Sequence, residues 1–180
     1  MKNLSLLLIS ALVAIAANAT VGATFENGDL AYKVTQDPTS SAHGEVTVTG
    51  LSANGKTKSS LSLTIPTSVS YNSKTHLVKS VANSAFASQS NLTGVTINYG
   101  ITDLNASAFY NCANITFANI PSSCRYIYSK VFVGCTKLTT VRYALTTDPN
   151  DGANIINSDA FPTNSGMTLY VTMTNPDAVA

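Results

Sequence analysis

Two cysteines, Cys112 and Cys135, are separated by a 23-residue interval in the sequence. Because other residues of this chain repeat at the same interval, we expect the two sulfur atoms to lie in adjacent coils, near the distance that a disulfide needs. The alternative, which we favour, is that each is a small buried apolar residue, as free cysteine often is. The third cysteine, Cys124, falls at an inward position of the repeat, which predicts an unreactive thiol.

The other residue types that could do chemistry are isolated. Neither His43 nor His76 has a cysteine, histidine or carboxylate at the spacing of metal ligands, so we predict that both are solvated loop residues. Asp148, Asp151 and Asp159 offer oxygens for calcium, but Asp-Pro-Asn-Asp-Gly is ordinary turn sequence, and we favour a turn.

No catalytic motif accompanies these residues. The sequence holds no H-E-x-x-H, G-x-S-x-G or phosphate-binding loop, and no pair of carboxylates at a spacing typical of glycosidases. It therefore predicts no enzyme, no catalytic residue, no metal site and no cofactor.

Charge is sparse along the whole chain of 180 residues. Only 11% of the residues are charged, the formal net charge is +1, and lysine and arginine do not cluster. Nucleic acid is therefore an unfavourable partner, because phosphate recognition needs a basic surface. The abundant Ser, Thr and Asn suit strands that face water.

The start of the chain, residues 1–19, has the pattern of a secretory signal peptide. Lys2 precedes an apolar stretch from Leu4 to Ala17, and Ala17-Asn18-Ala19 fits the small-x-small cleavage rule. The alternative is a membrane anchor, but the stretch is shorter than the ~20 residues of a spanning helix. We predict cleavage after Ala19, no membrane span thereafter, and a secreted or cell-surface protein.

A 23-residue repeat organises the middle of the chain. Phe86, Phe109 and Phe132 recur at that interval. Five further positions keep an apolar residue in all three units, namely Val78, Ile101 and Cys124; Val81, Leu104 and Ile127; Leu92, Ile115 and Leu138; Val95, Ala118 and Val141; Ile97, Ile120 and Tyr143. A fixed period of this length is typical of a solenoid.

Less exact units flank the three regular ones. Phe161 follows Phe132 at a longer interval than the repeat, with 146–152 as the expected extra loop, and Leu61–Pro66 resembles the segment at Ile120-Pro121. The longer gap before Phe86 is expected to hold a hairpin with its turn at Tyr71–Lys74.

The spacing predicts a mainly β fold. Each return of the chain lays a strand beside its predecessor, so the coils form a parallel sheet and the phenylalanines an internal ladder. Alternating residues in 24–55 predict a β-rich N-terminal cap, and Met167–Val171 predicts the last strand. We divide the chain into a signal peptide (1–19), a cap (20–60), a solenoid (61–174) and a tail (175–180).

Three segments of the repeat, Ser84–Leu92, Ser107–Ile115 and Lys130–Leu138, resemble the AF-x-x-C-x-x-L signature of BspA-like leucine-rich-repeat surface proteins. The isoleucine-proline element in Asn119–Ser123 is also similar to that family. Leu30–Thr35 and Val69–Leu77 are similar to lead-in segments of its members from Bacteroides-type bacteria. The resemblance covers about residues 25 to 172.

This sequence departs from the family pattern at two places. Gln89 stands where the signature has cysteine, and Tyr143-Ala144 stands where it has isoleucine-proline. The resemblance implies a leucine-rich-repeat solenoid at the cell surface or secreted, with a role in adhesion or other recognition.

The outward strand positions are the remaining candidate site, because solenoids commonly bind through one extended face. Aligning the units gives three outward rows, namely Thr93, Thr116 and Thr139; Gly94, Phe117 and Thr140; and Thr96, Asn119 and Arg142. All of these residues except Gly94 are candidate ligand-binding residues. Phe117 and Arg142 are of the types favoured as interface anchors, although the alternative is a solvated sheet face.

We therefore expect a recognition or adhesion module whose partner is a host or neighbouring-cell protein or glycan. The alternative is a structural component that associates with its own copies, such as a surface-layer or fimbria-like protein.

Overall fold

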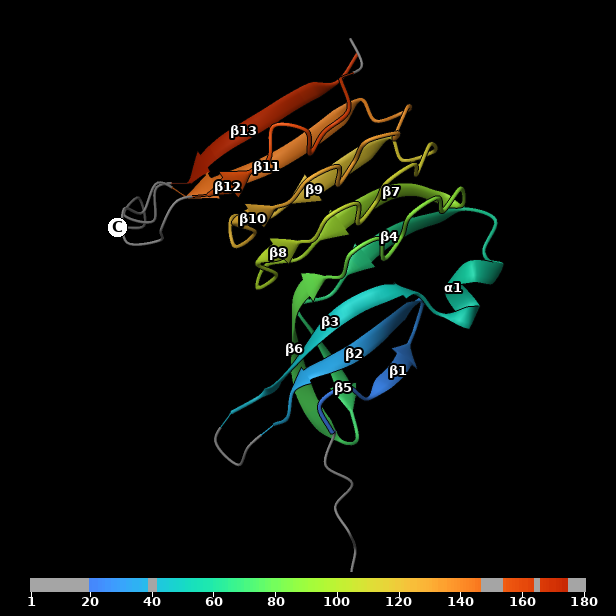
Figure 1. Ribbon diagram of the computed structural model, residues 1–180, viewed down its shortest axis with the longest axis vertical. Coiled ribbons are helices and arrows are strands. Elements are labelled where there is room, and N and C mark those ends of the chain that lie inside the picture. Colours follow the sequence, from blue (N-terminus) through green and yellow to red (C-terminus); the bar gives the residue numbers. More distant parts are fainter. Residues whose placement is uncertain (1–19, 39–41, 147–153, 164–165, 175–180) are drawn as a thin grey trace, which may run out of the picture.

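The computed structural model describes residues 20–38, 42–146, 154–163 and 166–174 (Figure 1). The elements in chain order are β1 (Thr24–Asn27), β2 (Leu30–Gln36), β3 (Gly44–Leu51), α1 (Ala53–Thr57), β4 (Leu61–Ile65), β5 (Ser68–Tyr71), β6 (Lys74–Val81), β7 (Leu92–Ile97), β8 (Asp103–Leu104), β9 (Phe117–Ile120), β10 (Tyr126–Ile127), β11 (Thr140–Thr146), β12 (Ile155–Ile156) and β13 (Thr168–Thr174). The predicted signal peptide, the tail and the predicted loop at 146–152, apart from Thr146 at the end of β11, lie outside the described residues.

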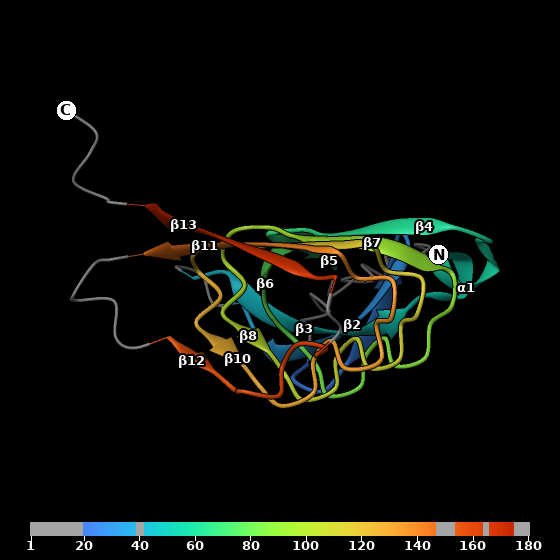
Figure 2. The same ribbon diagram turned by 90° about the horizontal axis from the view of Figure 1, so that it is seen from above.

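The strands form two sheets that enclose the core. Sheet A has the order β1-β2-β3-β6-β8-β10-β12, with β5 paired to β6, and sheet B has the order β13-β11-β9-β7-β4. Figure 2 shows sheet B along one side of the molecule and β8, β10 and β12 across from it. Each coil therefore passes from a long strand of sheet B to a short strand of sheet A and returns through a turn.

The strands of the repeat pair in parallel at equivalent positions, as the spacing predicts. In sheet B, Ala118 pairs with Val95 on one side and with Val141 on the other. In sheet A, Ile127 pairs with Leu104 and with Ile156. The predicted mainly β solenoid with a parallel sheet is confirmed.

The phenylalanine ladder is also confirmed. The ring centroids of Phe86 and Phe109 are 5.0 Å apart, those of Phe109 and Phe132 5.2 Å, and those of Phe132 and Phe161 5.6 Å. The interplanar angles do not exceed 8°, and the first three rings are fully buried. Backbone hydrogen bonds join the turns that carry them, such as Phe109 N to Val131 O at 2.9 Å.

Each turn of the ladder uses two residues with left-handed backbone. Ser84, Ser107 and Lys130 have φ between 53° and 59°, and Ser88, Asn111 and Gly134 have φ between 57° and 81°. Both series keep the interval of the repeat. Non-glycine residues at positive φ are uncommon, so their return at the interval of the repeat shows that every turn of the ladder has the same backbone conformation.

The N-terminal cap is built from the antiparallel strands β1, β2 and β3, as the alternation in 24–55 predicts. β3 then pairs in parallel with β6, so the cap and the solenoid share sheet A. The short helix α1 was not expected. Ser52 begins it, because its hydroxyl accepts a hydrogen bond from Gly55 N at 3.0 Å.

The prediction that His76 is a solvated loop residue is wrong. His76 lies in β6 and is 0% exposed, whereas His43 is exposed as predicted. The cause is the pairing of β6 with β3, which seats the imidazole against Gly44, where a Cβ would lie 2.3 Å from the ring. The edge of the ring also meets Tyr71, the residue that precedes the confirmed hairpin turn.

Candidate ligand-binding face

The candidate residues from the sequence lie together on the outer face of sheet B. The pairing places Thr96, Asn119 and Arg142 side by side in one row. Phe117 pairs with Thr140 in the next row. The structure thus brings these residues onto one face, although their role in binding stays a prediction.

The threonine row has a structural use. The Thr116 hydroxyl donates to the carbonyl of Thr93 at 3.0 Å, and the Thr139 hydroxyl donates to the carbonyl of Thr116 at 3.3 Å. These hydroxyls join successive coils where the chain enters sheet B. Both hydroxyl groups therefore already donate their proton within the solenoid, so this row is the least suited to hold a ligand.

Phe117 packs on its own sheet. Its ring covers Gly94 in the preceding coil, because a Cβ at Gly94 would meet the ring at 2.2 Å. Phe117 is consequently half-buried. The aromatic side chain that the sequence suggested as an anchor thus fills the space left by a glycine.

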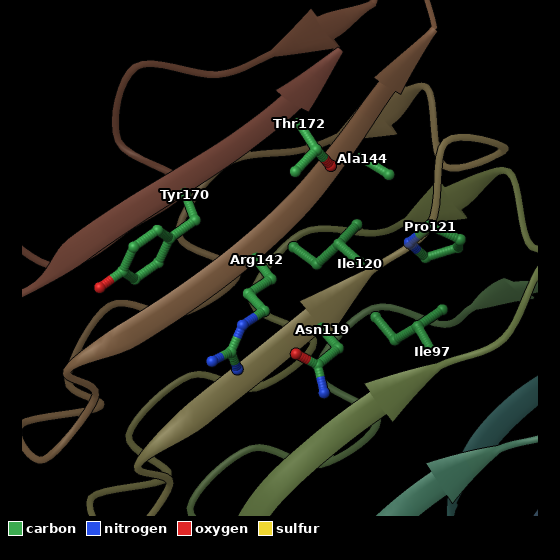
Figure 3. A pocket seen from close by; sticks show the side chains of 8 residues that line it. All are labelled: Ile97, Asn119, Ile120, Pro121, Arg142, Ala144, Tyr170 and Thr172. Carbon is green, nitrogen blue, oxygen red and sulfur yellow. The ribbon is translucent and has the colours of Figure 1, made fainter. Parts of the chain in front are cut away.

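A shallow pocket of about 400 Å³ opens farther along the same face (Figure 3). Asn119 and Arg142 line it together with Tyr170 of the last strand, which pairs with Arg142. Its other lining residues are Ile97, Ile120, Pro121, Ala144 and Thr172. Most of the lining is apolar, with polar groups at a few points, as is common in small-molecule sites.

Arg142 is the one charged residue in the strands of sheet B. Its guanidinium carbon lies 5.8 Å from the centre of the Tyr170 ring, a cation–π contact. The two ion pairs among the described residues lie elsewhere, Lys58 with Asp29 and Lys79 with Glu45. Within that part of the chain, the positive charge of Arg142 therefore has no carboxylate partner.

Asn119 is held beside Arg142. Its Nδ2 donates to the hydroxyl of Thr96 at 3.2 Å, while its Oδ1 is buried without a hydrogen-bond partner among the described residues. In Figure 3 this oxygen lies on the side of the Arg142 guanidinium. A buried acceptor without a donor is unfavourable, so Asn119 is under-satisfied in this arrangement.

The cysteines belong to the core. All three are buried and unbridged, and the Cys112 and Cys135 thiols donate to the carbonyls of Phe86 and Phe109 at 2.9 and 3.2 Å. The favoured interpretation of these residues is confirmed. Burial raises the pKa of Cys112 from 9.0 to about 11 and the pKa of Cys135 to about 12. For Cys124, burial and then the charge of Asp103 raise the pKa to about 12.

These raised pKa values predict that the protein loses stability in alkali. The folded state holds the thiol protons more tightly than the unfolded state, so the stability is fully present below pH 9 and falls as the pH rises toward 12. Urea unfolding at a series of pH values measures this. We expect the free energy of unfolding of Cys124→Ala to decline less steeply with pH than that of the parent. Equal slopes would contradict the raised pKa of Cys124.

The remaining chemistry suggested by the sequence is not assembled into a site. Asp148 and Asp151 lie outside the described residues, and Asp159 is exposed. Where the structure describes the chain, no three His, Cys, Asp or Glu side chains gather as metal ligands. No helix in that part is long and apolar enough to cross a membrane.

Sequence reasoning missed the exposed tyrosines. Tyr170 escaped notice because the last strand of sheet B follows a longer unit, so alignment at the regular interval does not place it beside Arg142. The rings of Tyr126 and Tyr128 lie 6.3 Å apart on the opposite side, in and after β10, and both are exposed. The alternation of Tyr126 with the inward Ile127 is a signal that would have found them.

Comparison with protein families gives one match. The model described as the BspA type leucine-rich repeat region matches residues 57–175 in six copies. No curated protein matches the chain significantly.

Several solved structures share the fold. A leucine-rich repeat protein from Bacteroides ovatus superposes with a TM-score of 0.59 at 23% identity, over 83% of this chain and 42% of the other. A leucine-rich repeat protein from Bacteroides capillosus has a TM-score of 0.55 at 17% identity, over 83% of this chain and 98% of the other. A leucine rich cell surface protein from Faecalibacterium prausnitzii has a TM-score of 0.53 at 17% identity, over 84% of this chain and 43% of the other. The chain thus spans less than half of the first and third of these proteins.

Proposed function

The chain belongs to the BspA-type leucine-rich repeat family, and from that premise we propose that it is a secreted or cell-surface recognition module. It binds a protein or glycan ligand through the outer face of sheet B and catalyses no reaction. The observation that carries the proposal is the pocket in which the unpaired Arg142 meets Asn119 and Tyr170. The fold is shared with a leucine rich cell surface protein of Faecalibacterium prausnitzii, and this likeness and the predicted signal peptide support the location.

A binding screen tests the proposal. Residues 20–180, labelled at one end, are applied to an array of glycans and to immobilised matrix and cell-surface proteins. We expect reproducible capture that Thr172→Trp abolishes, because Thr172 is exposed and lines the pocket. Thr35→Trp is the matched control, an exposed threonine on β2 of sheet A. Absence of any ligand, or equal loss in both variants, would count against the face.

A second candidate, end-to-end association with other copies, is favoured by the last coil. Its inward residues Ile156, Leu169 and Val171 are 40%, 44% and 44% exposed. Ile127, Val141 and Tyr143, their counterparts one coil earlier, are 0%, 0% and 1% exposed. An open strand edge with uncovered apolar residues is a template for pairing. Sedimentation over a range of concentrations tests it, and Leu169→Arg should keep the protein monomeric; a strictly monomeric parent would remove the candidate.

A further inference from the structure

We propose that the pocket around Arg142 binds a sugar that carries a carboxylate, presented on a glycan. This inference rests on the proposed function, because it names the ligand class of the same face. Two properties of the pocket lead to it, an unpaired guanidinium and an apolar floor with polar groups at its rim.

The carboxylate follows from Arg142. Its guanidinium presents N–H donors in a planar fork that matches the two oxygens of a carboxylate. Among the described residues it has neither an ion pair nor a hydrogen bond, and its contact is with the ring of Tyr170. That contact leaves the edge of the guanidinium available to a ligand. A single cation without neighbouring lysines suits a group with one negative charge better than a phosphate, which commonly meets several cations.

The sugar follows from the rest of the lining. Pro121 and Ala144 supply partly exposed apolar surface, which the C–H groups of a sugar ring can cover. Asn119 and Thr172 line the pocket with an amide and a hydroxyl, while the Tyr170 hydroxyl points away from Pro121 and Ala144 in Figure 3. A volume of about 400 Å³ is near the lower end for small-ligand pockets and suits one substituted ring.

A peptide with a free carboxylate is the main competitor, and the position of the pocket disfavours it. Extended peptides bind sheets by adding a strand to an open edge, where backbone groups are unpaired. Arg142 and Asn119 come from β11 and β9, which are interior strands paired on both sides. The backbone of β9 and β11 therefore has no hydrogen bonds to offer a peptide. An added peptide strand would have to pair with the edge strand β13, one strand away from Arg142, so recognition by Arg142 relies on its side chain.

Titration followed by NMR of the isotope-labelled protein tests the inference. The probes are the methyl glycosides of N-acetylneuraminic acid and glucuronic acid, methyl glucoside as the neutral sugar, acetyl-dialanine as the carboxylated peptide, and sulfate. We expect both acidic sugars to shift resonances of β9, β11 and β13 and to bind at least tenfold more tightly than the other three probes.

Variants connect the affinity to the guanidinium. Arg142→Gln should weaken binding of the acidic sugars at least tenfold. The affinity of Arg142→Lys should lie between those of the parent and Arg142→Gln, because lysine keeps the charge but lacks the planar fork of N–H donors. Lys33→Gln, on the exposed side of β2, removes the same charge elsewhere and should leave the affinity unchanged.

The outcomes separate this inference from the proposed function. Equal binding of methyl glucoside, of the peptide or of sulfate, or full affinity in Arg142→Gln, would overturn the carboxylated sugar even if the screen finds a ligand for the face. A screen in which Thr172→Trp leaves every captured ligand in place would instead overturn the face itself.

Discussion

Phe109→Ala is expected to lower the free energy of unfolding by about 3 to 5 kcal/mol, the usual cost of emptying a packed aromatic site. The ring is fully buried and stacks on Phe86 at 5.0 Å and on Phe132 at 5.2 Å. Its removal leaves a cavity in the middle of the ladder that neither neighbour can fill, because both are fixed by their own coils. Urea unfolding followed by circular dichroism measures the loss.

Phe161→Ala provides the matched comparison. This ring ends the ladder, is only partly buried and stacks on Phe132 alone, at 5.6 Å. We expect it to cost clearly less than Phe109→Ala. A loss below about 1 kcal/mol at Phe109 would mean that the ring is not packed as described, since only surface substitutions cost so little.

The ladder could be predicted because one observable, the interval of the repeat, specifies where every inward side chain lies. Once Phe86 and Phe109 occupy equivalent places, the pairing of Val95 with Ala118 follows, as does the burial of Cys112. The outward rows of sheet B follow from the same interval by alternation along each strand. The core and the candidate face were therefore accessible from periodicity alone.

Features that depend on contacts outside the repeat were not accessible. His76 is buried because β6 pairs with β3 of the cap, and the interval of the repeat carries no information about that pairing. The pocket needs Tyr170, which joins Arg142 only through a coil longer than the others. Phe117 has the residue type of an interface anchor, but its ring packs over Gly94 of the preceding coil. In each case the missing information was the register between segments of unequal length or the packing between neighbouring coils.

Tyr143→Phe is expected to lower the free energy of unfolding by about 1 to 3 kcal/mol, since it leaves a buried carbonyl without its donor. Tyr143 is 1% exposed, and its hydroxyl donates to the carbonyl of Cys124 at 2.5 Å. This bond joins β11 of sheet B to the segment that leads into β10 of sheet A. Phenylalanine keeps the ring, so urea unfolding would report the loss of the hydrogen bond rather than of packing.

Tyr170→Phe is the control, because Tyr170 is exposed in the neighbouring strand and its change should cost less than about 0.5 kcal/mol. Equal effects at Tyr170 and Tyr143 would mean that the bond to Cys124 contributes nothing. Tyr143→Ile would restore the residue that the preceding coil has at Ile120, with which Tyr143 pairs. We expect it to cost more than Tyr143→Phe, because it removes the ring as well as the donor. The departure from the family pattern at Tyr143 is thus part of how this coil closes, and the repeat consensus is the wrong guide there.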